Sequence, residues 1–157
     1  MDMLKPGDKA PSFELKDQNE KTVKLSDFEG RKLLLYFYPK ADTPGCTAQA
    51  SSVRDSMQEL AGIGLSVIGI SPDRPGEQKK FDNKYCLGFA LLSDEDHAVA
   101  QAYGAWGPKP MYGKDTMGII RSAFVIDESG RIIEAFYEVG PEETVPKAID
   151  AVAAASR

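Results

Sequence analysis

The chain has 157 residues, of which 42% are hydrophobic and 27% charged, and this composition predicts one soluble globular domain over residues 1–157. Its net charge is -5 and no run of Lys or Arg exceeds two residues, which argues against nucleic acid or a membrane surface as a partner. Two cysteines and one histidine are too few for a secreted disulfide scaffold or a zinc site.

The N-terminal region lacks the apolar segment of a signal peptide, and no apolar stretch approaches the length of a membrane span. We therefore expect a cytoplasmic protein, in which cysteine serves redox or catalytic chemistry.

Apolar runs and helical patterns divide the chain into elements. The predicted strands cover residues 12–15, 22–25, 33–38, 65–70, 89–92, 119–126 and 132–139. The predicted helices cover residues 46–62, 77–85, 95–103 and 144–155. Residues 104–118 are punctuated by glycine and proline and are predicted to form a long functional loop.

The order of these elements predicts an α/β fold. The first two strands form an N-terminal β-hairpin extension, and the central strands then alternate with helices. Such alternation predicts a mainly parallel central sheet flanked by helices, with an antiparallel edge from the last hairpin. This order is compatible with a thioredoxin-like fold.

Cys46 stands where the loop after strand 33–38 leads into a helix. The N-terminus of a helix offers unpaired backbone N–H groups and the positive end of the helix dipole, and both stabilise a thiolate. Pro44 and Gly45 fix the approach of the chain. The stretch therefore predicts a reactive, ionised cysteine.

The segment FYPKADTPGCTAQ resembles the active-site motif of the peroxiredoxins, in which proline, threonine and cysteine are spaced P-x-x-x-T-x-x-C. Here these residues are Pro39, Thr43 and Cys46. The blocks at 67–73, 91–107 and 111–127 are similar to the Q-type branch, the bacterioferritin comigratory protein family. The resemblance covers nearly the whole chain.

The resemblance implies a thiol peroxidase that reduces hydrogen peroxide and organic hydroperoxides without metal, haem or flavin. Cys46 would be the peroxidatic nucleophile and would pass through a sulfenic acid. Thr43 and Arg121 would hold the peroxide against the thiolate, and Pro39 would shield it from water. Thioredoxin, a glutaredoxin-type protein or another thiol would regenerate an enzyme that we expect to be a monomer.

The second cysteine of the reaction is not evident. Many Q-type relatives carry a resolving cysteine five positions after the peroxidatic one, where this chain has Ser51. Either a natural one-cysteine form or an engineered replacement fits this serine. Cys86 is the remaining candidate for the resolving residue, although relatives with such a cysteine on the next helix place it about one turn earlier. Its alternative role is that of a packed helix cysteine.

Other side chains could suggest different chemistry. His97 is the single histidine, but its place early in a predicted helix favours a structural role over a Cys–His pair. Trp106 and Tyr112 are expected to pack or to line the rim of the loop.

Two alternative functions stay open. A thiol–disulfide oxidoreductase on the same fold is disfavoured because the chain has no C-x-x-C motif. A peroxide-sensing relay or holdase would instead form mixed disulfides between oxidised Cys46 and client proteins.

Overall fold

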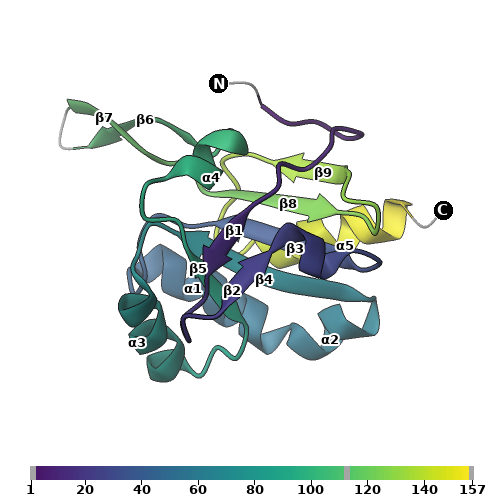
Figure 1. Ribbon diagram of the computed structural model, residues 1–157, viewed down its shortest axis with the longest axis horizontal. Coiled ribbons are helices and arrows are strands. Elements are labelled where there is room, and N and C mark those ends of the chain that lie inside the picture. The colour runs from purple at the N-terminus through teal and green to yellow at the C-terminus, as the bar shows by residue number, and fades with distance from the viewer. Residues whose placement is uncertain (1–2, 112–113, 156–157) are drawn as a thin grey trace.

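The computed structural model describes residues 3–111 and 114–155. Within these residues seven strands form one sheet in the order β2-β1-β5-β4-β3-β8-β9, and β6 and β7 form a separate hairpin (Figure 1). The strands are β1 (Glu14–Lys16), β2 (Thr22–Lys24), β3 (Lys32–Phe37), β4 (Leu65–Ser71), β5 (Ala90–Ser93), β6 (Trp106–Met111), β7 (Lys114–Ile119), β8 (Ser122–Ile126) and β9 (Ile132–Phe136). The helices are η1 (Leu25–Phe28), α1 (Pro44–Asp55), α2 (Met57–Gly62), α3 (Pro75–Tyr85), α4 (Ala98–Ala102) and α5 (Thr144–Ala155).

The α/β fold with a helix-flanked sheet and an N-terminal hairpin is confirmed, but the sheet is mixed rather than mainly parallel. Strand β3 pairs in parallel with β4, and β4 with β5. The pairings β1–β2, β1–β5, β3–β8 and β8–β9 are antiparallel. The prediction included an antiparallel edge from the last hairpin, but it was wrong on the balance of the pairings, because the N-terminal hairpin joins the same sheet as well and only two pairings among the described residues are parallel.

Side chains alternate along β3 between two cores. Leu34 and Tyr36 belong to the buried cluster that contains Cys46 and residues of α1, α2, α3 and α5. Leu33 and Leu35 belong to the cluster on the other face, under α4 and the N-terminal segment. Because β3 is buried on both faces, its sequence is a continuous apolar run and not an alternation of apolar and polar residues. No helix in the described part of the chain is long and apolar enough to cross a membrane.

The predicted loop at residues 104–118 is mostly a β-hairpin, so that prediction was wrong. Strands β6 and β7 pair from Trp106↔Ile119 to Met111↔Lys114, and the hairpin projects from the body of the molecule (Figure 1). Proline is compatible with β6 because this strand has a neighbour on one side only, and the other edge requires no N–H donor. Tyr112 lies outside the described residues.

Two predicted helices differ from those observed. The helix predicted over residues 46–62 is divided at Ser56, whose N–H bonds to the carbonyl of Val53 three residues earlier. The helix predicted over residues 95–103 is shorter, because His97 has a left-handed backbone with φ 59°. The Asp94 carboxylate accepts hydrogen bonds from the N–H groups of Val99 and Ala100, which caps this short helix.

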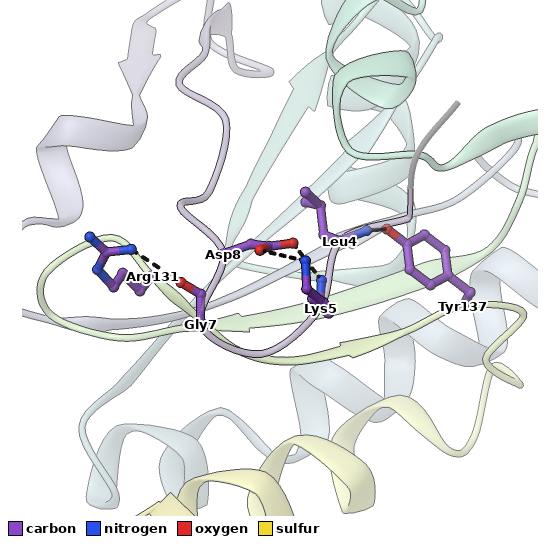
Figure 2. Close-up of polar contacts among 6 residues, drawn as sticks. All are labelled: Leu4, Lys5, Gly7, Asp8, Arg131 and Tyr137. Carbon is purple, nitrogen blue, oxygen red and sulfur yellow. Dashed lines mark hydrogen bonds and ion pairs between the residues drawn. The ribbon is translucent and has the colours of Figure 1, made fainter.

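The N-terminal segment before β1 is hydrogen-bonded to residues on either side of β9 (Figure 2). The N–H of Leu4 donates to the Tyr137 hydroxyl at 2.8 Å, and Arg131 Nη1 donates to the Gly7 carbonyl at 3.1 Å. The N–H of Lys5 donates to the Asp8 carboxylate, and its ammonium lies 3.1 Å from the same group. These two contacts hold the pKa of Asp8 below its usual value.

Candidate active site

Cys46 lies in the first turn of α1 and its side chain is buried, with 1% of the residue exposed. Pro44 begins the helix, where a residue without an N–H is tolerated. Thr43 is the N-cap, with an extended backbone, and its carbonyl accepts from the N–H of Thr47 at 2.8 Å. The structure thus confirms the position predicted for Cys46 at a helix N-terminus.

Arg121 reaches Cys46 from the connection between β7 and β8. Strand β7 ends at Ile119 and β8 begins at Ser122, so the predicted strand 119–126 is interrupted. Arg121 therefore lies between two strands, whereas we expected it on one. Its Nη2 donates to Cys46 Sγ at 3.5 Å. A Cβ atom on Gly45 would lie 3.0 Å from the same Nη2, so glycine allows the guanidinium to approach the helix. The arrangement places a permanent cation beside the buried sulfur.

Gln49 is a site residue that the sequence reasoning missed. It is fully buried, and its Oε1 accepts from Arg121 Nη1 at 2.7 Å. Its Nε2 donates to the hydroxyl of Thr144 on α5 at 2.8 Å, and that hydroxyl donates to the Gly140 carbonyl. Gln49 follows Cys46 by three residues, and this helical spacing puts the two side chains on one face. That spacing was the available signal.

We predict that Gln49→Ala slows the reaction of Cys46 with peroxide by roughly 10-fold to 100-fold, because a hydrogen bond to a charged group contributes about 1.5–3 kcal/mol. Without the amide, the guanidinium of Arg121 loses its fixed orientation. Stopped-flow oxidation measures the effect. Thr144→Val is the matched control, since it removes the hydroxyl that contacts Gln49 and Gly140 and leaves the contact between Gln49 and Arg121 in place. A larger loss in Thr144→Val than in Gln49→Ala would contradict the assignment.

Thr43 and Pro39 lie in the loop before α1. The Thr43 hydroxyl donates to the carbonyl of Lys40 at 2.7 Å and does not cap the helix. Pro39 is half-buried next to the end of β3. The structure places both residues in the loop that leads to Cys46, and their roles toward peroxide stay predictions.

Asp42 anchors this loop to the end of α3. It has a left-handed backbone with φ 63°, and its carboxylate accepts from the Tyr85 hydroxyl at 2.6 Å and from Lys84 Nζ at 2.9 Å. These two hydrogen bonds hold the pKa of Asp42 below its usual value. The N–H of Ala41 donates to the Asp73 carboxylate, which fixes the loop to the segment after β4 as well.

Cys86 lies at the C-terminal end of α3. It is exposed and ends α3 in a left-handed conformation with φ 53°. Arg54 donates to the carbonyl of Tyr85, so this end of α3 lies beside the C-terminal part of α1. Arg54 follows Cys46 by eight residues, about 12 Å of helix rise. Ser51 is half-buried on α1 between these two ends, and both cysteines are free.

His97 does not belong to this site. Its ring stacks on Trp106 with the centroids 4.0 Å apart, and Trp106 packs against the core on the opposite face of the sheet from Cys46. The stacking supports the structural role expected for both residues.

The chain has relatives of known family along most of its length. The model of the AhpC/TSA family matches residues 6–135. Peroxiredoxin Bcp of Escherichia coli is 51% identical over 136 residues, which cover 87% of each chain.

Solved structures share the fold. A structure of Xanthomonas campestris peroxiredoxin Q has a TM-score of 0.86 and 30% identity, covering 92% of each chain. A second Xanthomonas campestris structure has a TM-score of 0.86 and 29% identity, covering 92% of each chain. It comes from a study of the alkyl peroxide reduction activity of the bacterioferritin comigratory protein. The expected thioredoxin-like fold is thereby confirmed, and the chain belongs to the AhpC/TSA family, as a peroxiredoxin of the Bcp or peroxiredoxin Q group.

Proposed function

We propose that Cys46 is the peroxidatic residue of this chain and that it reduces hydrogen peroxide and organic hydroperoxides. The family makes the protein a thiol-dependent peroxidase, with peroxide substrates and a thiol reductant. The alkyl peroxide reduction studied in the Xanthomonas campestris relative supports organic hydroperoxides as substrates. The observation that carries the assignment is the buried sulfur of Cys46, held at a helix N-terminus and in contact with Arg121 Nη2.

In the proposed reaction the thiolate of Cys46 attacks one peroxide oxygen, and the O–O bond breaks. The sulfur becomes a sulfenic acid, while the leaving oxygen takes a proton and departs as water or an alcohol. A thiol then attacks the sulfur of the sulfenic acid, water leaves, and a second thiol reduces the resulting disulfide.

Arg121, Thr43 and Pro39 have separate roles in this proposal. Lowering the pKa of a free thiol from about 8.5 to about 6 raises the thiolate fraction at pH 7 only about 30-fold. Further acceleration must come from orientation and from donors directed at the separating oxygens. We assign that work to Arg121, the N–H of Cys46 and the Thr43 hydroxyl, which turns from the Lys40 carbonyl toward the peroxide in this proposal. We assign the exclusion of water to Pro39.

The reductant, the assembly and the location belong to the same proposal. We propose thioredoxin or a glutaredoxin-type protein as the reductant, and a cytoplasmic monomer as the working form. The exposed thiol of Cys86 is accessible to a partner protein, which supports an intermolecular role for it better than a direct attack on Cys46.

Peroxide consumption tests the proposed function. We expect catalytic loss of hydrogen peroxide and of an alkyl hydroperoxide when a thioredoxin system is present, and one sulfenic acid per chain when one equivalent of peroxide is added alone. Intact mass identifies the latter. Reduction of insulin disulfides without peroxide turnover would favour a thiol–disulfide oxidoreductase. Stable adducts with client proteins and slow turnover would favour a relay or holdase.

We predict that this chain accumulates Cys46 sulfenic acid and over-oxidises more readily than a Ser51→Cys variant. Five residues along α1 correspond to about 7.5 Å of rise on different helix faces. A disulfide needs Cα atoms within roughly 7 Å and suitably directed Cβ atoms, so the first turns of α1 must unwind to form it. With Ser51 this bond cannot form, and the oxidised sulfur waits for another thiol.

Peroxide titration followed by mass spectrometry measures this difference. Ser52→Cys is the matched control, because it adds a thiol at the next position of the same helix. Quantitative Cys46–Cys86 disulfide in the unaltered chain, without over-oxidation, would show that Cys86 resolves the sulfenic acid directly.

A further inference from the structure

Tyr36 carries a buried hydroxyl that has no hydrogen-bond partner among the described residues. The residue is 1% exposed, at the end of β3 nearest to the Cys46 loop. Other tyrosines of the core are partnered: Tyr38 donates to Gln78, Tyr103 to the Pro11 carbonyl and Tyr137 to the Tyr103 carbonyl. An unpartnered buried hydroxyl destabilises a fold, and phenylalanine would fill the same space without this cost.

The neighbours of Tyr36 leave room for this hydroxyl. Tyr36 pairs with Gly69 on β4 and with Ala123 on β8. A Cβ atom on Gly69 would lie 3.0 Å from the Tyr36 hydroxyl oxygen, so the glycine accommodates the polar end of the ring. The phenol therefore packs directly over Gly69.

The hydroxyl of Tyr36 lies in the electrostatic field of the site. Tyr36 and Cys46 belong to the same buried cluster. Burial raises the pKa of Tyr36, the neighbouring Cys46 raises it further, and the charge of Arg121 lowers it.

We propose that Tyr36 is a positioning residue for oxidised Cys46, whose hydroxyl donates a hydrogen bond to the oxygen that peroxide leaves on the sulfur. In the reduced protein the hydroxyl is not bonded to Sγ. The formation of the S–O bond extends the acceptor by one bond length and supplies an oxygen acceptor in addition to the sulfur. This inference rests on the proposed function.

Over-oxidation is the step that this hydrogen bond opposes. The sulfur of the sulfenate attacks a second peroxide, the O–O bond breaks, a sulfinate forms, and water or an alcohol leaves. A donor on the sulfenate oxygen withdraws electron density from the sulfur and fixes its orientation, so the sulfur is a weaker nucleophile. Tyr36 thereby prolongs the time in which a thiol can reduce the enzyme.

The test compares Tyr36→Phe with Tyr38→Phe, a matched control on the same face of β3 whose hydroxyl already has a partner. We expect Tyr36→Phe to convert sulfenic acid to sulfinic acid roughly three-fold to ten-fold faster, the factor for one hydrogen bond. We expect the pH profile of alkylation of reduced Cys46 to stay the same. Intact mass at increasing times after a second equivalent of peroxide gives the rate.

Thermal unfolding of both redox forms separates positioning from packing. We expect Tyr36→Phe to raise the midpoint temperature of unfolding of the reduced form, and to raise that of the oxidised form less or not at all. Tyr38→Phe should shift the midpoints of both forms by the same amount. Equal shifts of both redox forms and an unchanged over-oxidation rate in Tyr36→Phe would overturn the proposal.

A measurement on the unaltered chain covers the case in which Tyr36→Phe does not fold. The Cζ chemical shift of Tyr36 should move when Cys46 is oxidised, because its hydroxyl gains an acceptor. An unchanged shift contradicts the proposal. If the unaltered chain forms no sulfenic acid with one equivalent of peroxide, the proposed function itself fails, irrespective of Tyr36.

Discussion

Cys46→Ser is expected to reduce peroxide consumption to the uncatalysed background. A serine hydroxyl at the same helix N-terminus is not ionised at neutral pH and is a poor nucleophile without an adjacent general base. No carboxylate or imidazole is hydrogen-bonded to Cys46 in the described residues, and the neighbouring side chain on the sulfur is the Arg121 guanidinium. Stopped-flow mixing with one equivalent of peroxide and steady-state turnover with a thioredoxin system both measure the loss.

Cys86→Ser is the control for this variant. Cys86 is exposed at the end of α3, so the first oxidation of Cys46 should proceed nearly unchanged without it. Turnover falls in Cys86→Ser only if its thiol takes part in regeneration. A comparable loss of the first oxidation step in both variants would mean that the nucleophile is misassigned.

Arg121→Ala is expected to slow the oxidation of Cys46 by roughly 100-fold to 1000-fold, the range for removal of a donor that stabilises a developing charge. The guanidinium contacts both Cys46 Sγ and Gln49 Oε1, so its removal eliminates the cation and leaves the buried amide oxygen of Gln49 unpaired. Arg121→Lys should recover only part of the rate, because a single ammonium does not reproduce the planar fork that bridges the two groups.

Arg131→Lys is a matched control for Arg121→Lys, since it changes the same residue type in the turn between β8 and β9 and retains the charge. Its oxidation rate should equal that of the unaltered chain. Measuring the rate of alkylation beside the rate of oxidation separates thiolate formation from peroxide activation. An Arg121→Ala variant that oxidises at the normal rate would remove Arg121 from the mechanism.

Several elements were predictable because their signals are local. The apolar run that becomes β3 and the helical pattern that becomes α5 have the periods and lengths of buried elements, and α5 has the predicted bounds. The hairpin β6–β7 was not predictable in this way, since its glycines and prolines indicate a loop. The hydrogen bonds between β6 and β7 compensate for these residues. Proline destabilises the hairpin little, because the free edge of β6 requires no N–H donor.

The sequence by itself determined the position of Cys46 at a helix N-terminus, because Cys46, Pro44 and Thr43 are neighbours in one loop-to-helix junction and need no distant contact to define it. Only the tertiary structure decided what surrounds the sulfur. Gln49 and Arg121 are 72 residues apart and meet because β8 pairs with β3, which carries the connection before β8 to the start of α1. Local periodicity reports burial and backbone conformation, whereas the partner of a buried amide depends on the order of strands in the sheet.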